Sequence, residues 1–283
     1  MTRAFSDRLI DAFRARGVPA CVGLDPVLER LPDVAQGDTP AERLRSFGLR
    51  VIDATAGILP AIKFQSACFE RYGSAGIATL HHLARAASDA EMVTILDAKR
   101  GDIGISAEHY AAAAWDANFD AMTVSPYLGP DTLAAFLRPG RGLFVLVRTS
   151  NPGSDAVQSA RLADGRTVAQ LIADQVADIG ARTIGALGYS DVGAVVGATK
   201  STDAAALRER LPRQIFLVPG FGAQGGTASD VRAMLDGRTD CGGGVLVTAS
   251  RSVIFPESSS PWASAVRSAA LRLADQVRSA IGA

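Results

Sequence analysis

Two lysines and three aspartates are the residues of this sequence best suited to chemistry. Asp97, Lys99 and Asp102 form an Asp-x-Lys-x-x-Asp run, and Asp25 and Lys63 precede it. Lysine is rare, since only three of the 29 basic residues are lysines and the rest are arginines. An ammonium group can give up a proton whereas a guanidinium group cannot, so a retained lysine points to proton transfer.

The spacing within the run predicts which side chains lie together. Asp97 and Lys99 are two residues apart, so on a continuing strand both point to the same side. Asp102 lies beyond Gly101, off the predicted strand. A surface salt bridge is the alternative for any single Asp–Lys pair. Several such charges at the ends of neighbouring strands favour a functional cluster instead. Lys200 lies in a polar turn, and we predict that it is a surface residue.

A second candidate is the glycine-rich segment 220–226. It fits the Gly-x-Gly-x-x-Gly pattern of dinucleotide sites, but the acid expected after the next strand is missing, because Asp240 precedes that strand. In a β/α-barrel the loops after strands seven and eight hold phosphate. Glycines admit backbone N–H groups to an anion, and Arg251 can bind two phosphate oxygens. We therefore predict a phosphate site whose loop closes, with a plain tight turn as the alternative.

Short apolar, β-branched runs alternate with helix-length segments along the chain. Their hydrophobicity indicates buried strands of βαβ units in a parallel sheet. Eight alternations favour a closed (β/α)8 TIM barrel, a single domain over residues 1–283, rather than an open doubly wound sheet. Catalytic residues of such barrels lie at the C-terminal strand ends, where the charges above are found. The predicted strands are Pro19–Leu24, Pro60–Phe64, Met92–Leu96, Ala121–Val124, Leu143–Val147, Val192–Gly197, Ile215–Val218 and Val245–Thr248.

The segments between the strands are long enough for helices. Thr39-Pro-Ala-Glu42 is a helix start signal, with an N-cap, a proline and a capping-box glutamate. Extra helices are predicted at both ends of the repeat, over Phe5–Arg16 and Trp262–Ile281. The segment Thr149–Arg166 resembles a long loop, which indicates a lid or a subgroup insertion. Four of the predicted inter-strand helical segments are Ala41–Gly57, Ala67–Ala90, Ile103–Asn118 and Val157–Gly180.

Bulk composition narrows the class of protein. The formal net charge is zero, so nucleic-acid binding has no electrostatic support. No apolar run reaches the length of about 18 residues that a membrane span needs. The start of the chain does not look like a secretory signal. Three widely spaced cysteines, Cys21, Cys68 and Cys241, argue against a disulfide framework and fit a cytoplasmic location. The three histidines lack metal-ligand spacing, so no metal site is expected.

These residues resemble the orotidine 5′-monophosphate decarboxylase family. The length of the chain and its segment Asp-Ala-Lys-Arg-Gly-Asp-Ile-Gly are similar to those of the longer bacterial subgroup, type 2. The Asp-x-Lys-x-x-Asp run is highly specific in this context, and the pieces cover nearly the whole chain in the family's order. They are Gly-Leu-Asp25-Pro, Lys63-Phe, Asp97-Ala-Lys99-Arg-Gly-Asp102-Ile, Thr123-Val-Ser-Pro-Tyr127, Ser150-Asn-Pro-Gly, Pro219-Gly-x-Gly-x-Gln224-Gly-Gly and Ser250-Arg251.

The resemblance implies conversion of orotidine 5′-monophosphate to uridine 5′-monophosphate and CO2, a step of de novo pyrimidine biosynthesis, without metal or cofactor. It implies a charge network of Lys63, Asp97, Lys99 and Asp102. In that network Lys99 is the proton donor, and Asp102 comes from the second subunit of a homodimer. Asp25 and Lys63 would contact the ribose hydroxyls.

The resemblance also implies contacts to the base and the phosphate. Ser150 would read the pyrimidine edge, although Thr149 offers a second hydroxyl and the choice stays open. Gln224 would bridge base and phosphate, and Arg251 would bind the phosphate. The remaining substrate-binding positions are Thr123, which could reach the partner's site, Pro219 and Ser250.

Physical chemistry agrees with this assignment. Loss of CO2 from C6 leaves a carbanion that the pyrimidine ring does not readily delocalise. An ammonium between two carboxylates stays charged, stabilises that anion and supplies the replacing proton. Asp97 would lie near the departing carboxylate, and two like charges 4 Å apart repel by roughly 4 kcal/mol at an effective dielectric of 20. Binding of the remote phosphate offsets such strain.

Four alternatives remain. A magnesium-dependent sugar-phosphate decarboxylase of the same barrel superfamily would share the Asp-x-Lys-x-x-Asp run, but would need an acid where Lys63 lies. A Schiff-base aldolase would need a readily deprotonated lysine, which crowding carboxylates oppose. A non-catalytic nucleotide-binding barrel or a structural interaction protein would be expected to lose part of the charge network, which is whole here.

Overall fold

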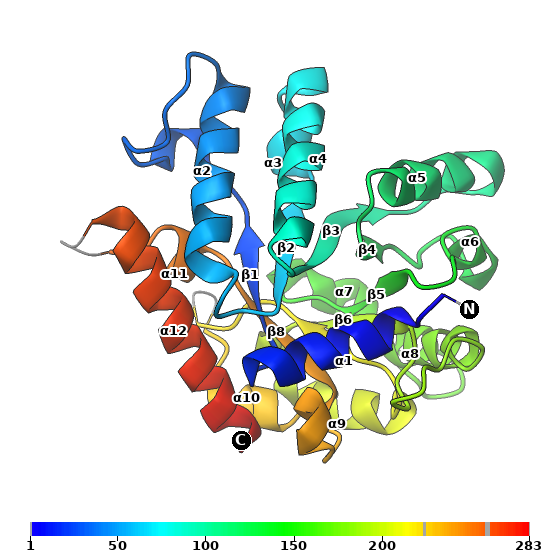
Figure 1. Ribbon diagram of the computed structural model, residues 1–283. Helices are drawn as coiled ribbons and strands as arrows, with labels where there is room; N and C mark the ends of the chain where they lie inside the picture. Colours follow the sequence, from blue (N-terminus) through cyan, green and yellow to red (C-terminus); the bar gives the residue numbers. More distant parts are fainter. Residues whose placement is uncertain (1, 223–224, 258–260, 283) are drawn as a thin grey trace.

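In the computed structural model the chain forms a closed barrel of eight parallel strands in sequence order, β1 to β8 (Figure 1). The structure describes residues 2–222, 225–257 and 261–282. Within these ranges, Thr239 and Cys241 are described by their backbone alone. The predicted TIM barrel is therefore confirmed. The strands are β1 Ala20–Leu24, β2 Ala61–Gln65, β3 Val93–Arg100, β4 Ala121–Val124, β5 Gly142–Arg148, β6 Val192–Val196, β7 Phe216–Val218 and β8 Val245–Ala249.

Helices surround the barrel, and both predicted terminal helices are present, α1 over Phe5–Arg16 and α12 over Trp262–Ile281. The capping box at Thr39 is also found: its side chain accepts from the Glu42 N–H. The other helices are α2 Pro40–Thr55, α3 Ala67–Glu70, α4 Gly73–Asp89, α5 Gly104–Asp116, α6 Pro130–Ala134, α7 Asp155–Gln158, α8 Val168–Gly180, α9 Ser201–Arg210, α10 Ala228–Arg232 and α11 Arg251–Ile254, with 3-10 turns η1 Leu28–Arg30, η2 Pro152–Ser154, η3 Ala198–Lys200 and η4 Thr239–Gly244.

Three sequence predictions need correction. The segment Ala67–Ala90 is two helices, α3 and α4, and α4 begins at Gly73, which has a φ of +60°. The helix predicted over Val157–Gly180 begins at Val168, because an antiparallel bridge of Arg161 with Thr167 closes a turn before it. Lys200 is largely covered rather than on the surface, since its side chain is 14% exposed and pairs with Asp155.

Successive side chains of each strand point to opposite faces of the sheet, so the barrel has two separate cores. Residues such as Cys21, Ala61 and Ile95 point into the barrel, where they form one cluster with the apolar face of α1. Helix α1 lies across the barrel (Figure 1), and its Leu9 and Ile10 are fully buried. The helix therefore closes the N-terminal end of the barrel and leaves the C-terminal end open.

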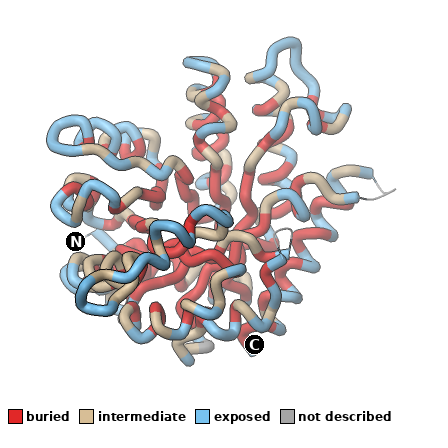
Figure 2. Tube along the Cα trace, turned by 180° about the vertical axis from the view of Figure 1, so that it is seen from behind, coloured by how far each residue is buried: buried red, intermediate tan, exposed pale blue. Residues whose placement is uncertain are grey.

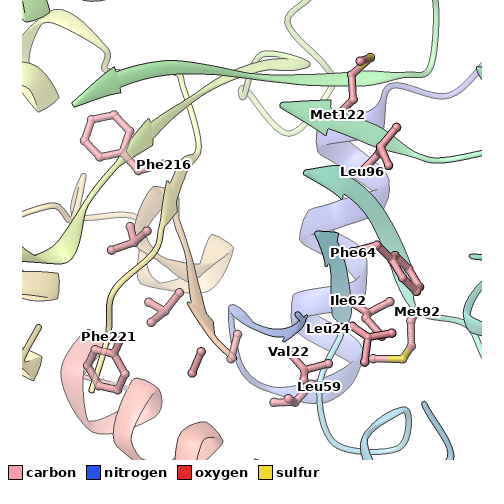
Figure 3. Packing of buried hydrophobic residues seen from close by; sticks show 14 of the residues in the cluster. Val22, Leu24, Leu59, Ile62, Phe64, Met92, Leu96, Met122, Phe216 and Phe221 are labelled. Carbon is pink, nitrogen blue, oxygen red and sulfur yellow. The ribbon is translucent and has the colours of Figure 1, made fainter. Parts of the chain in front are cut away.

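The second core lies between the strands and the outer helices. Val22, Ile62, Phe64 and Leu96 project from the outer face of their strands in Figure 3, and they belong to one large buried cluster with helix residues such as Phe47. Figure 2 shows the same organisation, with buried residues along the strands and exposed residues on outer helix turns and loops. These two cores hold the strand ends rigidly in place.

No helix among the described residues is both long and apolar enough to cross a membrane. Cys21 and Cys68 are free thiols, and burial raises their pKa to about 12 and about 11. Such thiols are poor nucleophiles near neutral pH. The side chain of Cys241 lies outside the described residues.

Candidate active site

A cavity of about 480 Å³ opens at the C-terminal ends of the strands. This volume is within the usual range of small-molecule sites. Every strand or its following loop contributes to the wall, as expected for a barrel active site. The lining residues are Asp25, Lys63, Gln65, Asp97, Lys99, Thr123, Leu146, Thr149, Ser150, Asn151, Gln158, Val195, Leu217, Pro219, Gly220, Phe221, Thr248, Ala249, Ser250 and Arg251.

Strand alternation aims the charged side chains into this cavity. Lys63 follows Ala61 by two residues, and Asp97 follows Ile95 by two residues. Ala61 and Ile95 both pack inside the barrel, so Lys63 and Asp97 form the next interior layer towards the open end. The parallel register pairs Gln65 with Asp97, which brings the ends of β2 and β3 side by side.

Lys99 reaches the cavity through an irregularity of β3. The pairing of β3 with β4 shifts register between Leu96 and Arg100, and Lys99 adopts a left-handed φ of +48°. Its backbone N–H donates to Thr123 Oγ1 at 2.9 Å, which stabilises this unusual conformation. Its Nζ lies 2.6 Å from Asp97 Oδ1, so the two residues meet, although through this irregularity and not through regular strand alternation.

Asp97 is the centre of the charge network. Its Oδ2 accepts from Lys63 Nζ at 2.6 Å and from Gln65 Nε2 at 3.3 Å. Its Oδ1 accepts from Lys99 Nζ at 2.6 Å and from Thr123 Oγ1 at 2.9 Å. Burial alone would raise the pKa of Asp97, but the two neighbouring ammonium groups outweigh it and lower the pKa to about 2. The carboxylate is therefore ionised at neutral pH.

Lys63 is buried and charged. Its side chain is 6% exposed, and although burial lowers its pKa, attraction to Asp25 and Asp97 outweighs this and keeps the pKa above its ordinary value. Asp25 Oδ1 lies 3.7 Å from Lys63 Nζ. That oxygen is buried and accepts no hydrogen bond from the described residues. It is therefore an acceptor available to a hydroxyl group.

The opposite side of the cavity is formed by β5, β6 and β7 and is less charged. Leu146, Val195 and Leu217 supply apolar surface there. Above them, the turn after β5 contributes Thr149 and Ser150. We did not predict the apolar layer, although two-residue spacing from interior positions such as Phe144 would have indicated it.

Gln158 on α7 is a lining residue that sequence reasoning missed. Its Oε1 accepts from the Thr149 N–H at 2.8 Å, and its Nε2 donates to Thr149 Oγ1 at 2.9 Å. The Thr149 hydroxyl donates to Asn151 Oδ1 at 2.7 Å. No sequence signal indicated this arrangement, because it depends on how the predicted loop Thr149–Arg166 folds back on itself.

The loops after β7 and β8 complete the cavity beside β1. Pro219, Ser250 and Arg251, three of the predicted substrate-binding residues, all line it. Gly23 on β1 permits close approach of Ser250, because a Cβ atom at Gly23 would lie 1.9 Å from Ser250 Oγ. Gly220 and Gly222 have φ values of +93° and +70°, which suit a tight glycine turn. The predicted residue Gln224 lies outside the described residues.

Asp102 is the one described member of the predicted charge network that the structure leaves outside the cavity. It lies beside a separate surface depression lined by Asp102, Ser106, His109 and Tyr110. Its Oδ1 accepts from the Ile103 N–H at the start of α5. Within the described part of the chain, no group of three or more His, Cys, Asp or Glu side chains is arranged to hold a metal ion.

Comparisons with known proteins agree with this geometry. Residues 20–265 match the Orotidine 5′-phosphate decarboxylase / HUMPS family. A relative from Rhodopirellula baltica, named orotidine 5′-phosphate decarboxylase, is 40% identical over 97% of this chain and 99% of its own. One of the same name from Roseiflexus castenholzii is 41% identical over 93% of both chains. The structure of Leishmania donovani OMP decarboxylase is similar with a TM-score of 0.79 and 33% identity, over 99% of both chains. The chain belongs to the orotidine 5′-phosphate decarboxylase / HUMPS family.

Proposed function

We propose that this protein decarboxylates orotidine 5′-monophosphate to uridine 5′-monophosphate, a step of pyrimidine biosynthesis, in the cytoplasm. The observation that carries the proposal is the chain of short ion pairs from Lys63 through Asp97 to Lys99 at the mouth of the barrel. The names of its relatives support the same activity. The family description covers two groups of proteins, orotidine 5′-phosphate decarboxylase and HUMPS. The residues of the site therefore distinguish between the reactions.

Lys99 is the proposed proton donor. Its side chain is 45% exposed, so its ammonium group is accessible from the cavity, in contrast to that of Lys63. An ammonium beside C6 stabilises the carbanion as CO2 leaves and then protonates the same carbon. Asp97 is ionised, so it holds Lys99 in place and repels a substrate carboxylate until neutral CO2 forms. This chemistry requires no metal or cofactor.

The other ligand groups follow from the free donors and acceptors of the cavity. Asp25 Oδ1, which accepts no hydrogen bond from the described residues, would accept from a ribose hydroxyl, and Lys63 would donate to one. Arg251 lines the cavity with Gly220, and it would bind the phosphate together with backbone N–H groups near Gly220. Pro219 and Ser250 would flank that phosphate.

Ser150, rather than Thr149, is the proposed reader of the pyrimidine edge. The Thr149 hydroxyl already donates to Asn151 and accepts from Gln158. A hydroxyl has one proton to donate, so Thr149 has none left for the base. Gln224 remains the proposed bridge between base and phosphate, and loop 220–226 the proposed lid.

We further propose that the site is shared across a homodimer. Asp102 lies outside the cavity of its own chain, and large apolar side chains that follow it in the sequence or lie in the segment after β4 are exposed to solvent. A second copy of the chain would cover them and bring Asp102 to the partner's cavity. Thr123 belongs to its own chain's cavity instead, because it is buried and donates to Asp97 Oδ1. The exposed side chains are Ile103 at 63%, Ile105 at 69%, Tyr110 at 41%, Tyr127 at 86% and Leu128 at 47%.

Product identification tests the proposal against its nearest rival. Purified protein given orotidine 5′-monophosphate should release CO2 and leave uridine 5′-monophosphate, as followed by NMR. A magnesium-dependent sugar-phosphate decarboxylase would instead act on a keto-hexulonate phosphate and leave the nucleotide intact. Lys63 at the end of β2 supports the nucleotide reaction, because that rival would need an acid there.

A further inference from the structure

Arg148 is a buried cation just outside the cavity wall. It is the last residue of β5, and its side chain is 4% exposed. The pairing of β5 with β6 shifts register between Leu146 and Arg148. Leu146 lines the cavity whereas Arg148 does not, so the irregularity turns the guanidinium away from the cavity. A buried arginine beside a binding site needs a reason, because its desolvation is costly.

Every N–H donor of this guanidinium can be matched to an acceptor. Nε donates to Asp203 Oδ2 on α9 at 2.7 Å. Nη2 donates to Asp155 and to Ser159 Oγ, the latter at 3.1 Å. Nη1 donates to Ser154 Oγ at 2.9 Å and, over a longer 3.4 Å, to Gln158 Oε1. Arginine has five such donors and lysine three, so only arginine can make all of these contacts.

Two of these acceptors, Ser154 and Gln158, also form hydrogen bonds to Thr149 in the cavity wall. Ser154 Oγ donates to the Thr149 carbonyl oxygen at 3.0 Å. Gln158 binds both the N–H and the hydroxyl of Thr149. Three polar atoms of Thr149 are thus held by side chains that Arg148 holds in turn. Thr149 directly precedes Ser150, which packs so closely on Gly197 that a Cβ there would lie 2.9 Å from the Ser150 Cβ.

We infer that Arg148 is a positioning residue for base recognition, which fixes the turn 149–151 through Ser154 and Gln158. The inference rests on the proposed function, in which this turn faces the pyrimidine. The guanidinium already pairs with Asp203 on α9 and Asp155 on α7, so it is not available to bind substrate itself. Loss of Arg148 loosens the turn and leaves Lys99 and Arg251 in place, because these residues belong to other strand ends.

Paired ligands test this inference. Uridine 5′-monophosphate carries base and phosphate, whereas ribose 5-phosphate lacks the base. For Arg148→Met we expect binding of uridine 5′-monophosphate to weaken about 10- to 100-fold, whereas binding of ribose 5-phosphate changes less than about twofold. KM for the substrate should rise more than kcat falls, and Arg148→Lys should restore part of the loss.

Two further variants keep the test decisive. Arg210→Met removes an arginine that pairs with Asp174 between α8 and α9, away from the cavity, and should change neither ligand's affinity. Ser154→Ala removes one link to Thr149 and retains the buried ion pairs. It should weaken uridine 5′-monophosphate about 3- to 10-fold, and it replaces Arg148→Met if that variant does not fold. Equal weakening of both ligands, or no change in either, overturns the positioning role. If the wild type binds neither ligand, the proposed function itself fails.

Discussion

The two sides of the barrel mouth are built differently. On the side of β1 to β4, charged groups stand on the strands themselves: Lys63 and Asp97 are nine-tenths buried and contact each other directly. On the side of β5 to β8, the strands contribute mainly apolar surface such as Leu146, and most polar groups come from the segments that follow the strands, Ser150 and Arg251 among them. Strand positions are rigid and loop positions can adapt.

The difference indicates that the two sides have different functions, catalysis on the side of β1 to β4 and substrate binding on the side of β5 to β8. Transition-state stabilisation depends on preorganised charges, which the strands of the first side supply. Substrate binding and release depend on the second side, where the turn 149–151 is held by Ser154 and Gln158 and the loop after β7 is the proposed lid. Variants on the β1–β4 side should therefore reduce kcat, and variants on the β5–β8 side should mainly raise KM.

The largest effect is expected for Lys99→Ala. Removal of both the cation and the proton donor should lower kcat by about 10⁴-fold or more, while binding of uridine 5′-monophosphate is retained. Steady-state kinetics and calorimetry would measure the two quantities. Lys99→Arg keeps the charge but cannot donate a proton, so it should also be inactive. Substantial turnover by either variant would contradict the role of Lys99.

The variant Arg251→Ala should mainly weaken binding of the substrate. Loss of a charge-assisted phosphate contact should raise KM about 10²- to 10³-fold, with a smaller effect on kcat. The nucleoside orotidine has no phosphate and serves as the control substrate. If the variant slows orotidine and its phosphate by the same factor, Arg251 is not the phosphate ligand.

Mixing of inactive subunits tests the shared site. Lys99→Ala and Asp102→Ala are each expected to be inactive. In a heterodimer one site carries both defects and the other neither, so about a quarter of wild-type activity should return at equal mixing with random exchange. Mass spectrometry would show that subunits exchange. Exchange without recovered activity would place the function of Asp102 within its own chain.

The smallest effect concerns acid stability. The folded pKa of Asp97 is about 2, below its ordinary value of 3.8. A lowered carboxyl pKa stabilises the fold above pH 4, and this contribution is lost as pH falls through the folded pKa. It is worth on the order of 2 kcal/mol. Asp97→Asn should flatten the dependence of the unfolding free energy on pH between 4 and 2, measured by urea denaturation. An unchanged slope would mean that Asp97 is not held by the two lysines.

The two sides also differ in how much the sequence predicted. Lys63 and Asp97 could be placed because apolar strand patterns and barrel geometry determine where a strand end points. The course of β3 beyond Leu96 could not, since it depends on the pairing of Arg100 with Val124 across an irregularity. The contacts of Thr149 likewise depend on a side chain nine residues away that returns through the fold of a predicted loop.

One measurement tests the central claim most directly: the loss of orotidylate absorbance with purified protein in the presence of EDTA. The account attributes the chemistry to the ammonium group of Lys99, held by Asp97. It therefore predicts full turnover without added metal or cofactor, and none for the Lys99→Ala variant under the same conditions. Turnover that EDTA abolishes and magnesium restores would contradict the account and favour the metal-dependent reaction.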